Sequence, residues 1–566
     1  MKIVSRMISF FRRKSVTRFF VSLFLLFFLR LAEFAIDYNI GDGNGSMTSP
    51  IGLLLNATYV ILILFVSYYY STVEVKFSNK YFVIGVIIIG FFLSYISLQK
   101  GHWWGDDFAL YIAQAKAFTE NSINELQANQ KFTSENSAYV IGPSIYPWGY
   151  PVLISPVYNL FGLNLSALKI FTFVFLSFSL FLVYYLFRKE IGTQIFLFIA
   201  IFSLSPQFYL FKDSILSDIP FMFFALLGLA AIQTFYVKKH ILYSPIVGYL
   251  LTGTALFLAY SVRTIGIALL PTLIACQIYD FSINYKFDLK KYVTTNWQSF
   301  LTYLVLFFGL FLYSLYFNYS DASYMSHLEF ENFYEDIQFN IFYYINLISE
   351  FFEVPVLTNI SATLWGVYVP FIVYGAYIKR NEDYALILFV IFMLSILIIA
   401  PYQGGLRYIF AYLPITFYFL VVGIKKIQNH FTNSSLLHFL LVPVLIIFSQ
   451  SILIQTFNNF NNKEISIEGP FDKEGEELMN FINSNTLTKD VIIFYKPRAL
   501  RLLTGRNGFV VKEVSQILDG RADILIIQKN AKNDWFPETD NIKSIKDKLT
   551  IIFENEDFFV YRILSN

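Results

Sequence analysis

The sequence contains few of the residues on which metal-binding and nucleic-acid-binding proteins depend. Cys276 is the single cysteine among 566 residues, which excludes an intrachain disulfide and a cysteine-based metal cluster. The five histidines are dispersed and show no metal-ligand spacing. Only 14% of the residues are charged, the net charge is +2, and the basic residues are scattered among short loops. We therefore expect no nucleic-acid partner.

Long apolar segments dominate the chain instead. Hydrophobic residues make up 56% of the sequence and aromatic residues 20%, which is typical of a polytopic α-helical membrane protein. Windows long enough to cross about 30 Å of hydrocarbon recur along the chain. We predict about thirteen transmembrane helices, at 17–35, 51–71, 82–98, 164–187, 193–209, 215–236, 245–262, 264–280, 297–318, 360–378, 384–400, 408–423 and 437–456.

The basic residues predict the orientation of these helices. With the N-terminus in the cytoplasm, the inner segments contain about nineteen lysines and arginines and the outer segments about seven, a strong positive-inside bias. No small-residue cleavage site follows the first apolar run, so we expect a retained helix and not a signal peptide. An odd number of spans places the C-terminus outside. We expect a multi-pass protein of the plasma membrane, which is the inner membrane in a bacterium.

Three regions are distinguished by composition. An N-terminal segment, 1–81, carries two predicted spans, and the helical module 82–456 carries two long outer loops, 99–163 and 320–359. The second loop has apolar residues spaced for an amphipathic surface helix. In 463–566 the strand-like runs VIIFYK, ADILIIQK and LTIIFENEDFFVYRIL alternate with the helical segment EGEELMNFINS. This last region predicts a small extracytoplasmic α/β domain.

An acidic pair lies at the start of the first outer loop, in GHWWGDDFALYIAQAKAF at 101–118. Ionisable groups at membrane depth usually face a water-filled cavity in which they have a task, so Asp106 and Asp107 are the first candidates for a site. The alternative is structural, because an aspartate is also a preferred N-cap of an interfacial helix.

Charged residues also occur in three later outer turns. Asp218 lies in KDSILSDIPFMFF, Arg263 in AYSVRTIGIALLP, and Arg407 with Tyr408 in PYQGGLRYIFAYLP. Each arginine alone could extend to lipid headgroups. Together with the acidic pair on the same side of the membrane, the turns favour a shared cavity. The planar fork of arginine suits a phosphate group.

These segments together resemble the GT-C membrane glycosyltransferases, and most closely the group of protein O-mannosyltransferases and aminoarabinose (lipid A) transferases. The resemblance rests on the acidic pair, the S-D-x-P entry to a span, the R-T-I-G turn and the G-L-R-Y turn. It covers about 82–456 and includes a C-terminal outer domain. It implies an inverting glycosyltransferase that moves a sugar from a polyprenyl-phosphate donor to an extracytoplasmic acceptor, which is a protein, a lipid or a glycan.

The resemblance also implies roles for single residues. Asp106 matches the base that deprotonates the acceptor, and Asp107 stands where the family usually has a glutamate. Arg263 and Arg407, with Tyr408, match the groups that hold the donor phosphate. The remaining residues expected in the cavity are Asp218, His102 and Tyr146. No cofactor is implied, and whether the two acids bind a divalent metal stays open.

Two features of the sequence depart from this group, and two other functions compete with the transferase. The acidic pair follows the third predicted span instead of the first, and YPWGYP stands where related enzymes carry Lys-Pro-Pro.

A lipid-linked glycan polymerase or ligase would usually lack a folded C-terminal outer domain. A lipid-linked sugar flippase or transporter would place polar groups at the membrane midplane and often contain paired repeats. The span centres are largely apolar and no repeat is visible, so the transferase is favoured.

Overall fold

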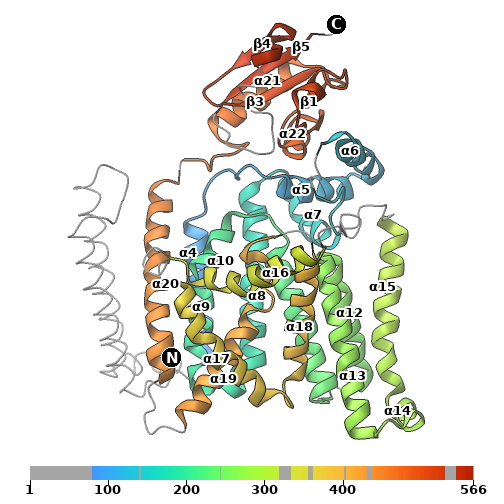
Figure 1. Cartoon of the computed structure of the whole chain (residues 1–566), viewed down its shortest axis with the longest axis vertical. Helices are drawn as coiled ribbons and strands as arrows, with labels where there is room; N and C mark the ends of the chain where they lie inside the picture. Colours follow the sequence, from blue (N-terminus) through green and yellow to red (C-terminus); the bar gives the residue numbers. More distant parts are fainter. Residues whose placement is uncertain are drawn as a thin grey trace, which may run out of the picture.

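The protein consists of a bundle of apolar helices with a small sheet domain at one end (Figure 1). The structure, a computed structural model, describes residues 80–138, 142–241, 244–317, 333–354, 361–400, 403–429, 436–463, 465–529 and 543–564. The first two predicted spans, 17–35 and 51–71, lie outside the described residues, as does much of the predicted outer loop 320–359.

The described apolar helices follow the predicted spans. They are α4 (Lys80–Ile96), α8 (Leu165–Ile191), α9 (Ile195–Ser203), α11 (Asp218–Ala231) with the π-helical turn η3 (Ile232–Val237), α12 (Pro245–Val262), η4 (Thr264–Ala268) with α13 (Leu269–Tyr285), α15 (Leu301–Phe317), α17 (Ser361–Lys379), α18 (Tyr384–Ile399), α19 (Leu413–Gln428) and α20 (Leu436–Asn461). Short connecting helices are η1 (Gly192–Gln194), α10 (Pro206–Leu210), η2 (Phe211–Asp213), α14 (Leu289–Asn296), η5 (Trp297–Phe300) and η9 (Leu406–Ile409).

Within the described ranges, seven helical segments are long and apolar enough to cross a membrane, and α4 and α18 are shorter apolar helices. A multi-pass integral membrane protein is thereby indicated, whereas the total of about thirteen spans stays a prediction. Two predicted boundaries differ. The span predicted at 193–209 is interrupted after Ser203, and Pro206 begins a new short helix. The span predicted from 408 becomes α-helical only at Leu413, because η9 occupies the preceding turn.

Close backbone approach holds part of the bundle together. Gly375 on α17 faces α19, where an added Cβ would lie 1.9 Å from the carbonyl oxygen of Phe419. Gly423 on α19 faces α17 in the same way, 2.0 Å from the carbonyl oxygen of Phe371. Small residues at such crossings let membrane helices pack closely without a hydrophobic driving force. Any side chain at either position would force α17 and α19 apart.

Shorter helices lie across the end of the bundle that faces the sheet domain (Figure 1). The first outer loop forms α5 (Asp106–Thr119), α6 (Ile123–Asn136) and α7 (Gly149–Phe161). The described part of the second forms α16 (Phe333–Leu347) and η7 (Ile348–Phe352). Helix α16 exposes apolar side chains such as Phe339 and Phe342, and its place at the membrane surface stays a prediction.

The C-terminal domain contains a five-stranded sheet in the order β2-β1-β3-β5-β4. Its strands are β1 (Val491–Ile493), β2 (Asn507–Phe509), β3 (Ile524–Gln528), β4 (Leu549–Glu554) and β5 (Phe558–Ile563). Its helices are α21 (Lys473–Asn485), α22 (Pro497–Thr504), η10 (Val514–Ile517) and η11 (Lys543–Lys548). Strands β1, β2 and β3 are parallel, and β5 is antiparallel to both β3 and β4. The domain is thus α/β, as the sequence predicts.

The first outer loop binds this domain on both faces of its sheet. Trp104 lies against the core on one face, with its ring 5.6 Å from Phe494 and 5.8 Å from Phe558. Phe132 of α6 packs against the core on the other face. The backbone of Ala138 also donates to the carbonyl of Val510 at 2.8 Å. The domain is therefore held on the same loop that carries the acidic pair.

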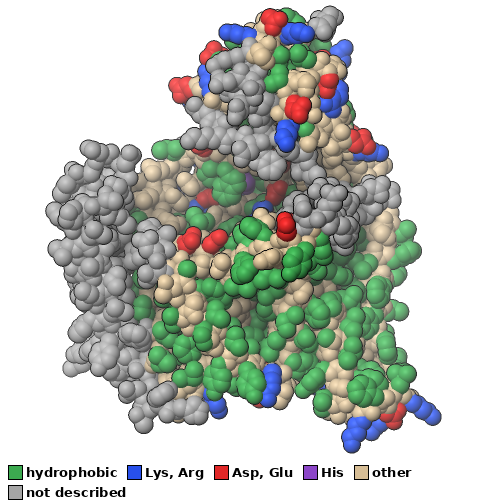
Figure 2. All heavy atoms as spheres, in the orientation of Figure 1, with side chains coloured by type: hydrophobic (Ala, Val, Ile, Leu, Met, Phe, Trp, Pro, Cys, Tyr) green, Lys and Arg blue, Asp and Glu red, His purple; other side chains and the backbone are tan. Residues whose placement is uncertain are grey.

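A hollow separates the C-terminal domain from the helices beneath it, and acidic, basic and histidine side chains are visible inside (Figure 2). Below the hollow, the surface of the helices is mainly hydrophobic, as a lipid-facing surface would be, and lysines and arginines gather at the far end. The charged residues predicted for the site belong to the end of the bundle that carries the hollow.

Candidate active site

The two acids begin α5 and then diverge. Gly105 precedes the helix in an extended conformation, and Asp106 and Asp107 occupy its first turn, where the helix dipole favours negative charge. Successive residues of an α-helix project about 100° apart, so adjacent side chains face different neighbours. Asp106 faces the C-terminal domain, and Asp107 faces the membrane helices.

Asp106 contacts the start of α22. Its Oδ1 accepts a hydrogen bond from the backbone N–H of Ala499 at 3.4 Å. Burial raises the pKa of Asp106, and the nearby charges of Lys496 and Arg498 oppose this only in part. Its carboxylate therefore joins the domain to α5, an arrangement that the sequence does not predict.

Asp107 joins two distant parts of the membrane module. Its Oδ1 accepts from the hydroxyl of Tyr146 at 2.6 Å, and its Oδ2 lies 3.4 Å from Nη1 of Arg407. Burial would raise the pKa of Asp107, but Arg407, the Tyr146 hydrogen bond and Arg498 outweigh it, so the pKa lies below its usual value. The side chain keeps 38% of its surface exposed, which leaves an ionised carboxylate accessible to a substrate.

Arg263 and Arg407 come together on Tyr408. The guanidinium carbons of Arg263 and Arg407 lie 4.7 Å and 5.6 Å from the centre of the Tyr408 ring. Arg263 also forms an ion pair with Asp218, which is buried at the start of α11. An aromatic face near two guanidinium groups offsets part of their mutual repulsion. Each arginine thus has one acidic partner, Asp218 for Arg263 and Asp107 for Arg407, and their planar forks are suited to binding an oxyanion.

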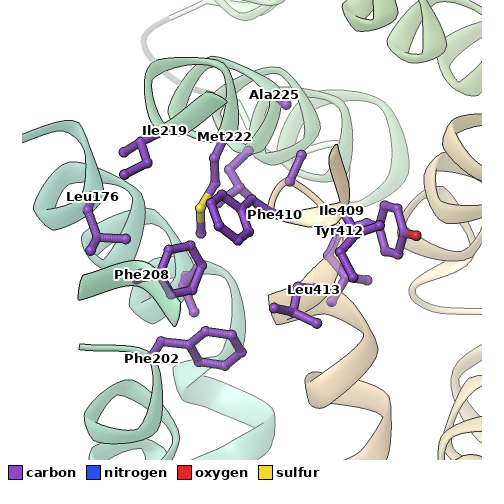
Figure 3. Packing of buried hydrophobic residues seen from close by; sticks show 14 of the residues in the cluster. Leu176, Phe202, Phe208, Ile219, Met222, Ala225, Ile409, Phe410, Tyr412 and Leu413 are labelled. Carbon is purple, nitrogen blue, oxygen red and sulfur yellow. The ribbon is translucent and has the colours of Figure 1, made fainter. Parts of the chain in front are cut away.

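Buried packing fixes the turn that carries Arg407. Phe410 follows it and packs 4.5 Å from the ring of Phe208, next to Met222 of α11 (Figure 3). Before the turn, Gly405 adopts φ +68°. At Gly404 an added Cβ would collide with the Tyr408 ring, so only glycine fits there. The carbonyl of Gly404 accepts from Nε of Arg407 at 3.1 Å, which leaves the outer edge of the guanidinium toward the site.

His102 is buried beside the site and supports the loop. Its Nδ1–H donates to the carbonyl of Trp103 at 3.0 Å, and its Nε2 accepts from the backbone of Ile215 at 3.3 Å. Burial lowers the pKa of His102 to about 4, so the ring is neutral at pH 7. Both ring nitrogens are engaged, and the ring stacks on Phe108 at 4.0 Å. In this arrangement His102 orients the loop before α5.

A buried ionic cluster anchors the same loop from the other side. The carboxylate of Asp213 lies 3.4 Å from Nζ of Lys169 and also pairs with Lys212. It accepts from the backbone of Gln99 at 3.0 Å, and Lys169 donates to the carbonyl of Gln99 at 2.9 Å. The backbone N–H and the carbonyl of Gln99, just after α4, are thus both hydrogen-bonded. These bonds fix the course of the chain from α4 to the acidic pair.

Comparison with known proteins identifies the fold of the chain. No protein-family model matches the sequence, and no curated protein matches it. Among solved structures, ArnT from Cupriavidus metallidurans in the apo state is similar with a TM-score of 0.54 and 11% identity, over 85% of this chain and 98% of that one. The chain has the GT-C fold. The same enzyme bound to undecaprenyl phosphate is similar with a TM-score of 0.52 and 11% identity, over 85% and 97% of the two chains.

The GT-C fold therefore agrees with the resemblance found in the sequence motifs. Within it, the structure brings Asp107, Tyr146, Arg407, Tyr408 and Arg263 together, with Asp218 buried beneath Arg263. Asp106 and His102 lie next to this group but face other partners. Among the described residues, no group of three or more His, Cys, Asp or Glu side chains is arranged to hold a metal ion.

One arginine near this group of residues is not predicted from the sequence. Arg498 of α22 is 2% exposed, and its guanidinium lies 5.7 Å from the centre of the Tyr146 ring. A signal was present, because the sequence KPRAL directly follows the strand-like run VIIFY. A helix that starts at the carboxyl end of a parallel strand often faces a ligand in α/β domains.

Proposed function

We propose that this protein is an inverting glycosyltransferase that uses a sugar linked to a polyprenyl phosphate and transfers it to an extracytoplasmic acceptor. The single observation that carries the proposal is the meeting of Asp107 with Arg407, next to Arg263, at the end of an apolar helical bundle. The GT-C fold supports it, and the similar ArnT structure was solved with undecaprenyl phosphate bound.

The two arginines supply what a departing lipid phosphate needs. As the bond between the anomeric carbon and the phosphate oxygen breaks, the electron pair stays on the phosphate, whose negative charge increases. Arg263 and Arg407 are fixed in position before the reaction, and such preorganised donors stabilise developing charge most effectively. Arg407 lies at the more exposed edge, with 28% of its side chain exposed, and Arg263 with 17% lies deeper.

Asp107 supplies the base. An acceptor hydroxyl attacks the anomeric carbon from the face opposite the phosphate, its proton passes to the Asp107 carboxylate, and the new bond has inverted configuration. The low pKa of Asp107 keeps the carboxylate ionised near neutral pH. Geometry decides the choice of base before pKa does. Asp107 lies beside the arginines, whereas the carboxylate of Asp106 accepts from α22.

The lipid pathway fits the same arrangement. The side chains of α15 and α16 expose large apolar groups, among them Phe307, Phe311 and Phe342, which suit contact with lipid. Together with the positive-inside pattern of the loops, this supports a cytoplasmic N-terminus and a reaction on the extracytoplasmic side. The donor then reaches the site from the membrane and the acceptor from outside.

The test is a transfer assay with the purified full chain in detergent. Labelled polyprenyl-phosphate sugars are incubated with cell-envelope acceptors, and the wild type is compared with Asp107→Asn and Asp106→Asn. We expect transfer by the wild type and by Asp106→Asn, and loss of transfer in Asp107→Asn. Binding of undecaprenyl phosphate is measured in parallel. A wild-type protein that neither binds this lipid nor transfers any sugar would overturn the proposal.

A further inference from the structure

The C-terminal domain contributes a guanidinium whose hydrogen bonds are incomplete. Arg498 is 2% exposed, and its Nη2 donates to the carbonyl of Pro143 at 2.6 Å. Its Nε and Nη1 are buried and have no hydrogen-bond partner in the described part of the chain. Buried charged donors are rarely left in this state, because the loss of their water is costly. The missing partner is therefore informative.

A second buried arginine of the same domain shows what a purely structural role looks like. Arg506 is 6% exposed, and its Nε, Nη1 and Nη2 all donate to oxygen atoms. Its partners are Thr486 and Asn483, with Thr504 on the same side. The domain thus satisfies one buried guanidinium fully and leaves the other open toward the site.

Nη1 of Arg498, one of the two donors without a partner among the described residues, lies near Gly142 and Tyr146. An added Cβ on Gly142 would lie 3.9 Å from Nη1 of Arg498 and 3.5 Å from the hydroxyl of Tyr146. Gly142 has φ +85°, a conformation that favours glycine, so the residue at this position carries no side chain of its own. The Tyr146 hydroxyl donates to Asp107 at 2.6 Å. The open guanidinium is therefore one side chain away from the proposed base.

The charge of Arg498 also lacks a close counter-ion. No acidic group lies within ion-pair distance of it among the described residues, although its field reaches both Asp106 and Asp107. It approaches from α22, which lies on the side of α5 away from the membrane helices (Figure 1). Arg263 and Arg407 approach from the membrane side, at the ends of α12 and the turn before α19. The acids therefore lie between two separate cationic positions.

We propose that Arg498 binds an oxyanion of the acceptor, a carboxylate or a phosphate group, at a position distinct from the one that Arg263 and Arg407 provide for the donor. This inference rests on the proposed transferase function, because it assigns the two cationic positions to the two substrates. A lipid-linked donor brings its phosphate to the membrane side, so the position under the C-terminal domain is left for the acceptor. An acidic group bound there would place a neighbouring hydroxyl next to Asp107.

The test measures binding of soluble anions to the full chain in detergent, first without and then with saturating undecaprenyl phosphate. The probes are inorganic phosphate and acetate, which separate the two oxyanion chemistries, and the signal is the change in tryptophan fluorescence or in unfolding temperature. We expect the wild type to bind at least one of the anions when the lipid is already bound. Arg498→Met should weaken that binding by about tenfold or more, the usual effect of losing hydrogen bonds to a charged group.

Matched variants make the result specific. Arg501→Met lies on the same helix, and its guanidinium pairs with Glu125 and Asn507 outside the site, so it should bind the anions as the wild type does. Arg498→Lys keeps the charge but loses the fork and should bind with intermediate affinity. Arg407→Met should weaken lipid binding and leave the soluble anion unaffected.

The assignment of Arg498 would be overturned if Arg498→Met and the wild type bound the anions with equal affinity. It would also be overturned if undecaprenyl phosphate displaced the anion, or if the wild type bound neither anion. The proposed transferase function fails separately, if undecaprenyl phosphate itself does not bind. In that case the titration without lipid still decides whether Arg498 holds an anion.

Discussion

Nη1 of Arg407 lies 3.4 Å from Oδ2 of Asp107, although 300 positions separate the two residues in the chain. Charge-assisted hydrogen bonds between nitrogen and oxygen are usually about 2.7–2.9 Å long. The contact is thus weak, and another oxyanion can replace Asp107 at Nη1 while Nε stays bonded to the carbonyl of Gly404. A phosphate arriving at Arg407 would release Asp107 from its counter-ion and make the carboxylate a stronger base when the donor is bound.

The two adjacent acids should differ in their effect on catalysis. Asp107→Asn should lower the rate of sugar transfer by about 10² to 10⁴, the usual contribution of a general base. Asp106→Asn should keep most activity, because the asparagine oxygen can still accept from Ala499 and because the pKa of Asp106 is already raised by burial. Initial rates at saturating donor test this. Inactive Asp106→Asn beside active Asp107→Asn would assign the base to Asp106, the residue that the sequence resemblance favours.

The hydroxyl of Tyr146 should set the acidic limit of activity. Its hydrogen bond stabilises the ionised form of Asp107 and helps hold the pKa below the usual value. Tyr146→Phe removes this donor, so the pKa of Asp107 rises. As the pH is lowered, the variant should then lose transfer at a higher pH than the wild type does. Profiles of rate against pH check the direction, with Tyr158→Phe on α7, the helix that follows Tyr146, as the control. A limit that stays in place or moves to lower pH would contradict the role.

The sequence motifs predict which segments meet, but they do not predict which acid faces the arginines. The sequence predicts the turns with Arg263 and Arg407 near the acidic pair because it predicts all of them on one side of the membrane. The division between Asp106 and Asp107 depends on where α22 docks, and that contact is 393 positions away in the chain. Local patterns carry no information on such a contact.

Local sequence patterns do not predict the role of His102 or the place of Arg498 beside the site, for a similar reason. His102 is polar and next to the acids in sequence, yet its partners Trp103 and Ile215 come from its own loop and from the chain before α11. The sequence around Arg498 predicts an ordinary strand and helix of a polar domain. Its burial follows from docking on Pro143, which no periodicity shows.

Arg407 should matter for the donor more than for the acceptor. Arg407→Met removes one of the two guanidinium groups around Tyr408, so the affinity for undecaprenyl phosphate should fall by about tenfold or more, in keeping with hydrogen bonds to a charged group. Arg380→Met is the matched control, because Arg380 is exposed at the opposite end of the bundle and its contact is the carbonyl of Tyr377. Binding of the lipid to both variants is measured directly. Equal affinity in Arg407→Met and Arg380→Met would remove Arg407 from the donor site.

Trp104 should couple the C-terminal domain to the site. Its ring lies within 6 Å of the rings of Phe494, Tyr495 and Phe558. Trp104 is half-buried, so its loss should cost less than the roughly 3–5 kcal/mol of a fully buried tryptophan. Trp104→Ala should still loosen the domain and with it the contact between Ala499 and Asp106. Hydrogen exchange of α5 and α22 should increase together, and transfer should fall.

Trp103→Ala separates this effect from a general loss of stability. The neighbouring tryptophan is 36% exposed and contacts the ring of His102 at 4.9 Å, so its removal should leave the docking of the domain intact. Protection of α22 from exchange should then match the wild type. If Trp103→Ala and Trp104→Ala raise exchange equally, or if only α5 responds to Trp104→Ala, the tryptophan does not transmit the position of the domain to the acids. A selective response of α22 and α5 to Trp104→Ala, with lowered transfer, is the result that follows from the ring contacts.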